Sequence, residues 1–308
     1  MIKFFSTILF ALACIPWAAS SSLTIVASIK PVAMLIKAVV GDEVSVEVLL
    51  SGNVSPHDYE LKFSDIRAIR SADFFVWVGP ELESNLSKAI ENYPSASVIQ
   101  LTRLNNIRWP ESSILMHQEH ISSHKHLHSL VTEEQNSSLS NLDPHLWLNP
   151  ENSLQIVNEL KLILGNRYPE HKASFEQNAD AFSLLLGSMD RETKEKFKQV
   201  KKKGFIVTHD GYGHFVEHYG LRQLGIINLT EGVSVTAQHR SRLAALSVNA
   251  TCIFTDPQNS SKVADQLAQK FELKSRELDT MGLNFSLEKN SYIEFFNDFS
   301  ATVLTCLE

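Results

Sequence analysis

The sequence lacks a hydrophobic run long enough to cross a membrane as a helix, which takes about 18 or more consecutive apolar residues. Its most apolar segment, residues 4–13, is shorter, follows Lys3, and precedes Pro16 and the small residues at 18–21. This order is typical of a cleaved secretory signal, so we predict a signal peptide at residues 1–20 and an exported mature chain. The alternative, a lipoprotein anchored through Cys14, is disfavoured because Ala11 stands where leucine is usual.

Cysteine is also scarce, at three residues in 308. Removal of Cys14 with the signal peptide leaves Cys252 and Cys306, which have no further cysteine or histidine near them to complete a structural zinc site. An even pair in an exported chain favours a disulfide, which would close a loop of about 55 residues and stabilise the fold by roughly 4 kcal/mol. We therefore predict a structural disulfide between Cys252 and Cys306.

Dense basic clusters are lacking as well. The chain has 28 lysines and arginines against 35 acidic residues, a formal net charge of -7, and its one dense basic run is at residues 201–203. Without a basic patch that could follow a phosphate backbone, the sequence disfavours nucleic acid as a partner. The 44% of hydrophobic residues is ordinary for a globular protein and is enough for two cores at this length.

What the sequence does have is an alternation of short apolar runs and helical patterns. Runs of unbroken apolar character are typical of strands covered on both faces, as in parallel sheets flanked by helices. Each half of the chain has four such runs, so we predict an α/β fold with a four-stranded lobe in each half. The predicted strands are residues 23–29, 44–50, 74–78 and 98–101, followed by 205–208, 224–228, 252–255 and 276–279.

A long predicted helix lies between the two halves. Apolar residues recur every three or four positions from Phe175 to Phe197, and the whole segment of some 30 residues gives a helix of about 45 Å. A shorter helix begins at Pro150 and is predicted to stop at Gly165. We therefore divide the mature chain into an N-terminal lobe (21–168), a linking helix (169–200) and a C-terminal lobe (201–308).

Residues 111–142 interrupt the N-terminal lobe with a polar segment that has no apolar periodicity. Long segments of this kind are usually functional or disordered. The segment contains five histidines that a flexible chain could wrap around a metal ion, and the alternative is a solvated linker. We predict accessory capture of metal by His117, His120, His124, His126 and His128.

Four other residues stand where a tight metal site is expected. Ligands of open parallel sheets bind beyond the carboxyl ends of the strands, and His57, His209 and Asp256 each follow a predicted strand. His145 lies between the histidine-rich segment and the helix that begins at Pro150. Three imidazole nitrogens and one carboxylate oxygen suit a tetrahedral Zn²⁺, whereas Mn²⁺ sites use more oxygen. The sequence therefore predicts that these four side chains meet in a cleft between the lobes.

The remaining candidates receive weaker predictions. Asp143 is expected to orient His145 or to shape its loop rather than to bind metal. His214 and His218 lie four residues apart on a predicted helix and could bind a metal ion, but we expect them on the surface of that helix. His171 and His239 belong to no pattern that indicates a function.

Four motifs stand in order along the chain: residues 56–60 (PHDYE), 143–150 (DPHLWLNP), 208–213 (THDGYG) and 254–258 (FTDPQ). Together they resemble the zinc and manganese substrate-binding proteins of ABC transporters, the cluster A-I metal-binding proteins. The resemblance covers essentially the whole mature chain. The histidine-rich segment and the cysteine pair make it most similar to the zinc-specific periplasmic branch.

The resemblance implies two (β/α)₄ lobes, each with a parallel sheet, bridged by one long rigid helix. It also implies that His57, His145 and His209 are the primary ligands of a metal in the cleft. Zinc-type members can have a metal-binding glutamate before the first histidine, but here that residue is Pro56. The fourth coordination position is therefore left open to Asp256 or to water.

The resemblance further implies a monomeric periplasmic protein, not an enzyme, that carries Zn²⁺ to a membrane ABC permease. One alternative is a manganese or iron carrier of the same family, with Asp256 as the oxygen ligand. The other is a hydrolase, because three histidines with an open position also describe catalytic zinc. Against the hydrolase, the sequence has no His-Glu-x-x-His motif, and Glu60 is a weak candidate for a general base.

Overall fold

The structure, a computed structural model, describes residues 23–42, 44–50, 54–91, 93–94, 97–111, 142–229, 233–258 and 261–308. The predicted signal peptide with Cys14 lies outside these residues, as do the five histidines predicted to capture metal. Among the described helices, none has both the length and the apolar character needed to cross a membrane.

The first half of the chain forms one parallel sheet with the strand order β2-β1-β3-β4. β1 is central, with Ala27 paired to Val48 on one side and to Val76 on the other. β3 is buried along its whole length, as its unbroken apolar run predicts. The strands are β1 (Thr24–Ala27), β2 (Ser45–Val48), β3 (Phe74–Trp77) and β4 (Val98–Gln100).

The second half repeats this plan in a parallel sheet with the order β6-β5-β7-β8, so the prediction of two four-stranded α/β units is confirmed. The backbone hydrogen bonds beyond the strand ends repeat as well. The N–H of Ser28 donates to the carbonyl of Val76, and the N–H of Thr208 donates to the carbonyl of Phe254. Ser28 and Thr208 therefore occupy equivalent places in the two sheets. The strands are β5 (Gly204–Val207), β6 (Arg222–Ile226), β7 (Ala250–Thr255) and β8 (Lys274–Glu277).

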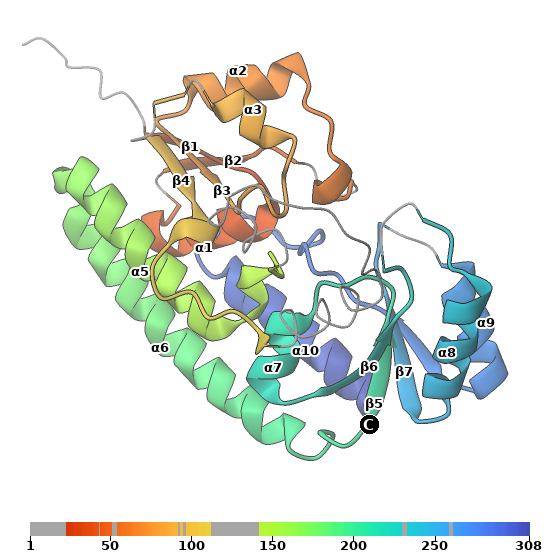
Figure 1. Ribbon diagram of the computed structural model, residues 1–308. Coiled ribbons are helices and arrows are strands. Elements are labelled where there is room, and N and C mark those ends of the chain that lie inside the picture. Colours follow the sequence, from red (N-terminus) through yellow and green to blue (C-terminus); the bar gives the residue numbers. More distant parts are fainter. Residues whose placement is uncertain are drawn as a thin grey trace, which may run out of the picture.

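Helices cover the two sheets and connect them. α5 and α6 run side by side along one flank of the molecule (Figure 1). α1 packs on the N-terminal sheet, α10 packs on the C-terminal sheet, and both contact α6. The helices are α1 (Lys30–Val40), α2 (Phe63–Ser71), α3 (Leu86–Ile90), α5 (Pro150–Arg167), α6 (Lys172–Phe197), α7 (Gly213–Tyr219), α8 (Ala237–Ser247), α9 (Lys262–Phe271) and α10 (Ser291–Leu307).

α6 is the predicted long helix, and it is unbroken over 26 residues. A 3₁₀ turn at Pro169–His171 precedes it, so it begins slightly later than predicted. Because α6 contacts α1 of the N-terminal lobe and α10 of the C-terminal lobe, it connects the two lobes. Its buried face is the predicted apolar stripe: Phe175, Ala179, Phe182, Leu186, Met189, Thr193 and Phe197.

The predicted end of α5 at Gly165 is wrong. The helix continues to Arg167, and Gly165 lies inside it, packed close to the side chain of Lys172. Tyr168 follows the last helical residue, and its backbone is no longer helical, at φ -127° and ψ 74°. Pro169 causes this ending, because a proline disfavours the helical conformation of the residue before it.

One hydrophobic core extends through both lobes. It joins Phe75 of the N-terminal sheet to Phe254 of the C-terminal sheet and Phe296 of α10. A smaller cluster, which includes Ile206 and Ile253, lies between the C-terminal sheet and helices α8 and α9. Since the lobes share the larger core, they cannot separate without exposing apolar surface to water.

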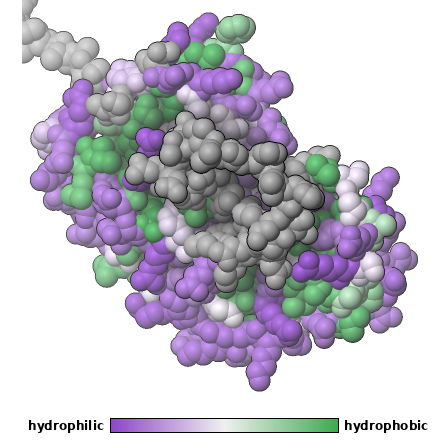
Figure 2. All heavy atoms as spheres, viewed as in Figure 1, coloured by the Kyte–Doolittle hydropathy of each residue, from purple (hydrophilic) through white to green (hydrophobic). Residues whose placement is uncertain are grey.

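Cys252 in β7 and Cys306 in α10 form the predicted disulfide, with their Cα atoms 5.9 Å apart. Both residues are fully buried, so the bridge attaches the last helix to an inner strand of the C-terminal sheet. On the outside, hydrophilic side chains cover most of the described part of the face shown in Figure 2. Large exposed apolar residues such as Phe63 and Leu184 come from separate helices, which is ordinary for a protein surface.

Candidate metal centre

Three of the four predicted ligands converge between the lobes. His57, His145 and His209 each contribute one ring nitrogen to a group whose members all lie within 4.8 Å of one another. His145 Nε2 and His209 Nε2 lie 3.3 Å apart. Two nitrogens bound to one tetrahedral zinc, each about 2.0–2.1 Å from the ion, are about 3.3 Å apart. The spacing of this pair is therefore already that of two ligands of one ion.

Each histidine belongs to a different part of the chain. His57 lies in a 3₁₀ turn, Pro56–Asp58, in the connection between β2 and α2, and its backbone N–H donates to Ser55 Oγ at 3.3 Å. His209 lies two residues beyond the end of β5. His145 precedes a 3₁₀ turn at Leu146–Leu148. The carboxyl end of each sheet thus supplies one histidine, and the segment that leads into α5 supplies the third.

The backbone of His145 forms a tight turn. Its φ of -80° and ψ of 52°, with a 2.8 Å hydrogen bond from the Leu146 N–H to the Pro144 carbonyl, define an inverse γ-turn. The Trp147 ring packs beside the imidazole, with ring centroids 5.2 Å apart, and its Nε1–H donates to the Thr280 carbonyl at 2.8 Å. The position of His145 is therefore fixed by local backbone and by a contact with the C-terminal lobe.

Asp143 orients the His145 ring. Its Oδ1 accepts the His145 backbone N–H at 3.0 Å and lies 2.7 Å from His145 Nδ1, which leaves Nε2 to face the other histidines. Burial alone would raise the pKa of the Asp143 carboxyl, but the charge and hydrogen bonds of His145, together with His214, hold that pKa well below its usual value. Asp143 is thus an anion, placed where it would stabilise a positive charge on the far side of the imidazole.

Asp256 has the same relation to His209. Its Oδ1 lies 3.1 Å from His209 Nδ1 and accepts the Tyr212 hydroxyl at 2.8 Å, while its Oδ2 accepts the Thr208 hydroxyl at 2.5 Å. Burial would raise its pKa, but the hydrogen bonds from His209, Thr208 and Tyr212 lower it below the usual value. The structure places this carboxylate behind His209 and outside the group of three.

His57 lacks such support. Among the described residues, no carboxylate is hydrogen-bonded to its ring, and its neighbours are the rings of His145 and His209, at centroid distances of 5.7 and 6.5 Å. Burial, together with the two neighbouring histidines, lowers the pKa of His57 to about 3. Its imidazole is therefore neutral near pH 7, which is the form that binds a metal ion.

The cavity at the three histidines is small. Its volume is about 20 Å³, and its wall includes the histidines, Asp256, Gln258 and Met281. Pockets that bind drug-sized organic ligands are usually about 300–1,000 Å³. A cavity of this size is thus suited to an ion rather than to a large organic ligand.

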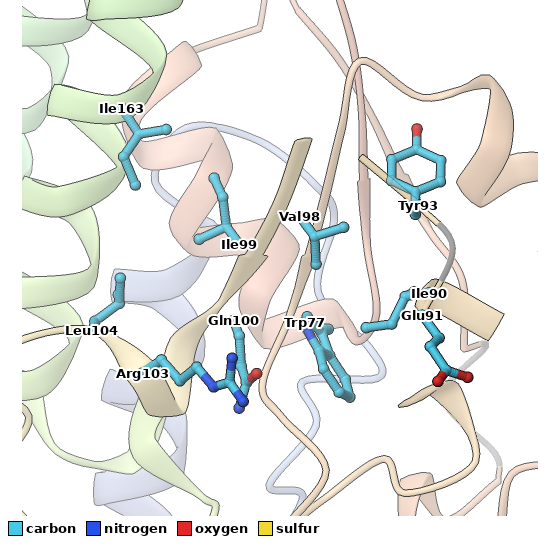
Figure 3. Close-up of a pocket in the computed structure, with 10 residues that line it drawn as sticks. All are labelled: Trp77, Ile90, Glu91, Tyr93, Val98, Ile99, Gln100, Arg103, Leu104 and Ile163. Atoms are coloured by element: carbon cyan, nitrogen blue, oxygen red, sulfur yellow. The ribbon is translucent and has the colours of Figure 1, made fainter. Parts of the chain in front are cut away.

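A larger cavity of about 510 Å³ lies elsewhere, around the edge strand β4. Figure 3 shows Ile163 and Ile99 on one side of this strand and Trp77, Val98 and Tyr93 on the other. The described residues of its wall are mainly apolar and include a single carboxylate, Glu91, and no histidine. These residues therefore do not provide the donors of a metal site.

The prediction that His214 and His218 lie on the surface is wrong. His214 is only 1% exposed, and the side chain of His218 is 4% exposed. His214 Nε2 bonds to the Asp143 carbonyl at 2.9 Å, and His218 Nε2 bonds to Asp190 Oδ1 at 2.7 Å. Neither ring belongs to the group of three, but His214 contacts the residue that orients His145. Sequence spacing gave no sign of this contact, because it depends on how α7 packs.

Comparisons with known proteins agree over nearly the whole chain. The family model described as zinc-uptake complex component A, periplasmic, matches residues 25–306. The chain is 30% identical over 297 residues to the high-affinity zinc uptake system protein ZnuA of Yersinia pestis, which covers 94% of this chain and 92% of that protein. It is 31% identical over 290 residues to the protein of the same name from Haemophilus ducreyi, with coverages of 92% and 93%. A crystal structure of ZnuA superimposes with a TM-score of 0.74 at 21% identity, covering 93% of this chain and all of that one.

Proposed function

The chain belongs to the zinc-uptake complex component A family, and we propose that it binds Zn²⁺ with high affinity in the periplasm and delivers it to an ABC-type importer. The observation that carries this proposal is the convergence of three ring nitrogens within 4.8 Å of one another in one small cavity. Relatives of this family are named as zinc uptake proteins, and the donor set found here is the one that zinc prefers.

The ligands in this proposal are His57, His145 and His209. His145 and His209 bind through Nε2, because the Nδ1 atom of each ring faces a carboxylate. Asp256 already accepts hydrogen bonds on both oxygens, which favours an orienting role over direct ligation. We therefore assign the fourth position to a water molecule, for which the cavity has space.

The same features support zinc over manganese or iron. Mn²⁺ prefers more oxygen ligands than three imidazoles provide. Zinc has no preference for six ligands and is satisfied by three nitrogens and one water.

The protein is not an enzyme, because its family consists of substrate-binding transport components. The geometry agrees with this assignment. A catalytic zinc site needs space for a substrate and a general base beside the open position. Of the described residues that line the cavity, the one carboxylate is Asp256, which is hydrogen-bonded to His209. The ion is the cargo of the protein.

The same proposal includes a signal peptide, a periplasmic location, a monomeric state and a permease partner. The Cys252–Cys306 disulfide supports an oxidising compartment outside the cytoplasm. Accessory capture of zinc by the five histidines between His117 and His128 also remains part of it. The ion bound by that segment would exchange rapidly and pass to the three-histidine site.

A competition titration tests the proposal. Purified mature protein, stripped of metal, is titrated with Zn²⁺ and Mn²⁺ against a chelating indicator. One tight site for zinc, with Mn²⁺ unable to displace it at large excess, is the expected result. Preference for Mn²⁺ would overturn the zinc assignment, and absence of tight binding for either ion would overturn the site.

A further inference from the structure

α7 contacts the chain on both sides of residues 112–141. Glu217 Oε2 accepts the backbone N–H of Glu111 at 2.7 Å, and His214 Nε2 lies 2.9 Å from the carbonyl oxygen of Asp143. His214 and Glu217 are three residues apart, on one face of the helix. Asp143, which orients His145, is therefore held by its backbone to α7 and by its side chain to the metal site.

The hydrogen bonds around His214 define its tautomer. Asn152 Oδ1 accepts the Arg108 N–H at 2.8 Å and its Nδ2 donates to the Arg108 carbonyl at 2.9 Å, which fixes the orientation of the amide. The same Nδ2 lies 3.2 Å from His214 Nδ1, so Nδ1 accepts a hydrogen bond. The proton of the neutral ring is then on Nε2, where it is donated to the Asp143 carbonyl.

α7 also packs directly against the Asp143 side chain. A Cβ atom at Gly213 would lie 2.8 Å from Asp143 Oδ2, so only glycine permits this approach. Asp143 is thus enclosed by Gly213 on its carboxylate side and by His214 on its carbonyl side. Since Pro144 has a fixed φ and His145 forms an inverse γ-turn, the Asp143 peptide unit determines where the His145 ring lies.

We propose that His214 is a positioning residue for zinc binding, which holds the Asp143 carbonyl so that Asp143 can aim His145 Nε2 at the ion. This inference rests on the proposed function, because it assigns His145 as a ligand. His214 itself does not bind the metal, since both of its ring nitrogens are engaged by Asn152 and Asp143.

Three substitutions of His214 separate this role from general packing. A glutamine amide reaches about as far as imidazole Nε2 and can donate to the Asp143 carbonyl, whereas an asparagine amide reaches only as far as Nδ1. We expect His214→Phe and His214→Asn to raise the Kd for Zn²⁺ about tenfold, at the lower end of the effect of partners that orient ligands. His214→Gln should stay within about threefold of the unmodified protein.

His218→Phe is the matched control, because it removes a buried, hydrogen-bonded histidine from the same helix without touching Asp143. It should lower the melting temperature of the metal-free protein but leave the zinc Kd unchanged. The absorption spectrum of the Co²⁺-loaded protein provides a second readout. His214→Asn should alter the Co²⁺ bands, and His218→Phe should not.

Equal zinc affinity in His214→Asn, His214→Gln and the unmodified protein would overturn the inference while leaving the proposed function intact. Failure of the unmodified protein to bind Zn²⁺ would instead overturn the proposed function. If the His214→Phe protein does not fold, the difference in zinc affinity between His214→Asn and His214→Gln still tests the inference. Long-range ¹H–¹⁵N spectra of the unmodified protein offer an independent check, since an Nδ1–H tautomer at His214 would contradict the assigned hydrogen bonds.

Discussion

His145 Nε2 and His209 Nε2 lie 3.3 Å apart, and each ring is held from behind by a carboxylate, Asp143 for the first and Asp256 for the second. These two histidines are 64 residues apart in the chain. Their distance is set by hydrogen bonds within the protein. His57 has no such carboxylate among the described residues, so the geometry distinguishes two candidate ligands that are held from behind from a third that is not.

Replacing His145 by alanine should abolish the tight site or weaken it by more than roughly 100-fold, because a ligand contributes more than a residue that only orients one. Deletion of residues 112–141 should leave one tight site and remove only weak, exchanging binding. Metal titration by calorimetry measures both variants. A lost tight site in the deletion variant together with a retained one in His145→Ala would contradict the assignment.

Asp143→Asn and Asp256→Asn should each weaken zinc binding by about 10- to 100-fold, because each removes the negative charge behind a ligand. The exposed Asp42, which lies at the end of α1 away from the site, provides the control Asp42→Asn. X-ray absorption of the zinc-loaded proteins separates orientation from ligation. Loss of one Zn–O contact in Asp256→Asn would show that Asp256 is a ligand and not a support for His209.

Glu83 should make the fold less stable as the pH rises from 5 to 7. The side chain is 2% exposed, and its burial raises the pKa to about 7, although hydrogen bonds from the backbone of Val78 and Gly79 oppose the shift. The unfolded value is about 4.3, so the folded state favours the protonated form, and stability is lost as pH rises between the two values.

The loss expected from Glu83 between pH 5 and 7 is about 2 kcal/mol in the free energy of unfolding. Glu83→Gln keeps an oxygen that can accept the same backbone hydrogen bonds and cannot ionise. Its denaturation curves at the two pH values should therefore differ less than those of the unmodified protein. An unchanged pH dependence would show that Glu83 does not titrate in this range.

Zinc binding should change the shape of the protein little. The shared core and the continuous α6 oppose any separation of the lobes. We therefore expect the radius of gyration from small-angle scattering to be the same, within error, for metal-free and zinc-loaded protein. A decrease of several ångströms on zinc addition would indicate a hinged closure and would contradict the role given to α6.

The sequence predicted those features that depend on local pattern. Unbroken apolar runs located the strands, and the spacing from Phe175 to Phe197 located the buried face of α6. Strand ends and motifs also indicated His57, His145 and His209 as one group. Gly165 misled the prediction, because a glycine can stop a helix or permit close packing, and only the neighbouring chain decides which.

The sequence did not predict which partners the polar side chains contact in the folded protein. Asp256 follows its strand at a position where a ligand would be expected, yet Thr208, Tyr212 and His209 occupy its oxygens. His214 and His218 have the spacing of an exposed pair, yet α7 is buried against α5 and α6 through Asn152 and Asp190. Such contacts join residues that are distant in the chain, and no local pattern records them.

The equivalence of Ser28 and Thr208 brings the residues that follow β3 and β7 into register as well. The two sheets have the same strand order and matching hydrogen bonds, so their positions can be compared one by one. In the C-terminal sheet, the residue that follows β7 is Asp256, which is hydrogen-bonded to Thr208 and His209. The equivalent residue after β3 in the N-terminal sheet is the apolar Val78, and the nearby acid Glu83 accepts hydrogen bonds from the backbone of Val78 and Gly79. The same position in two matching sheets therefore holds a carboxylate behind a histidine in one lobe and an aliphatic side chain in the other.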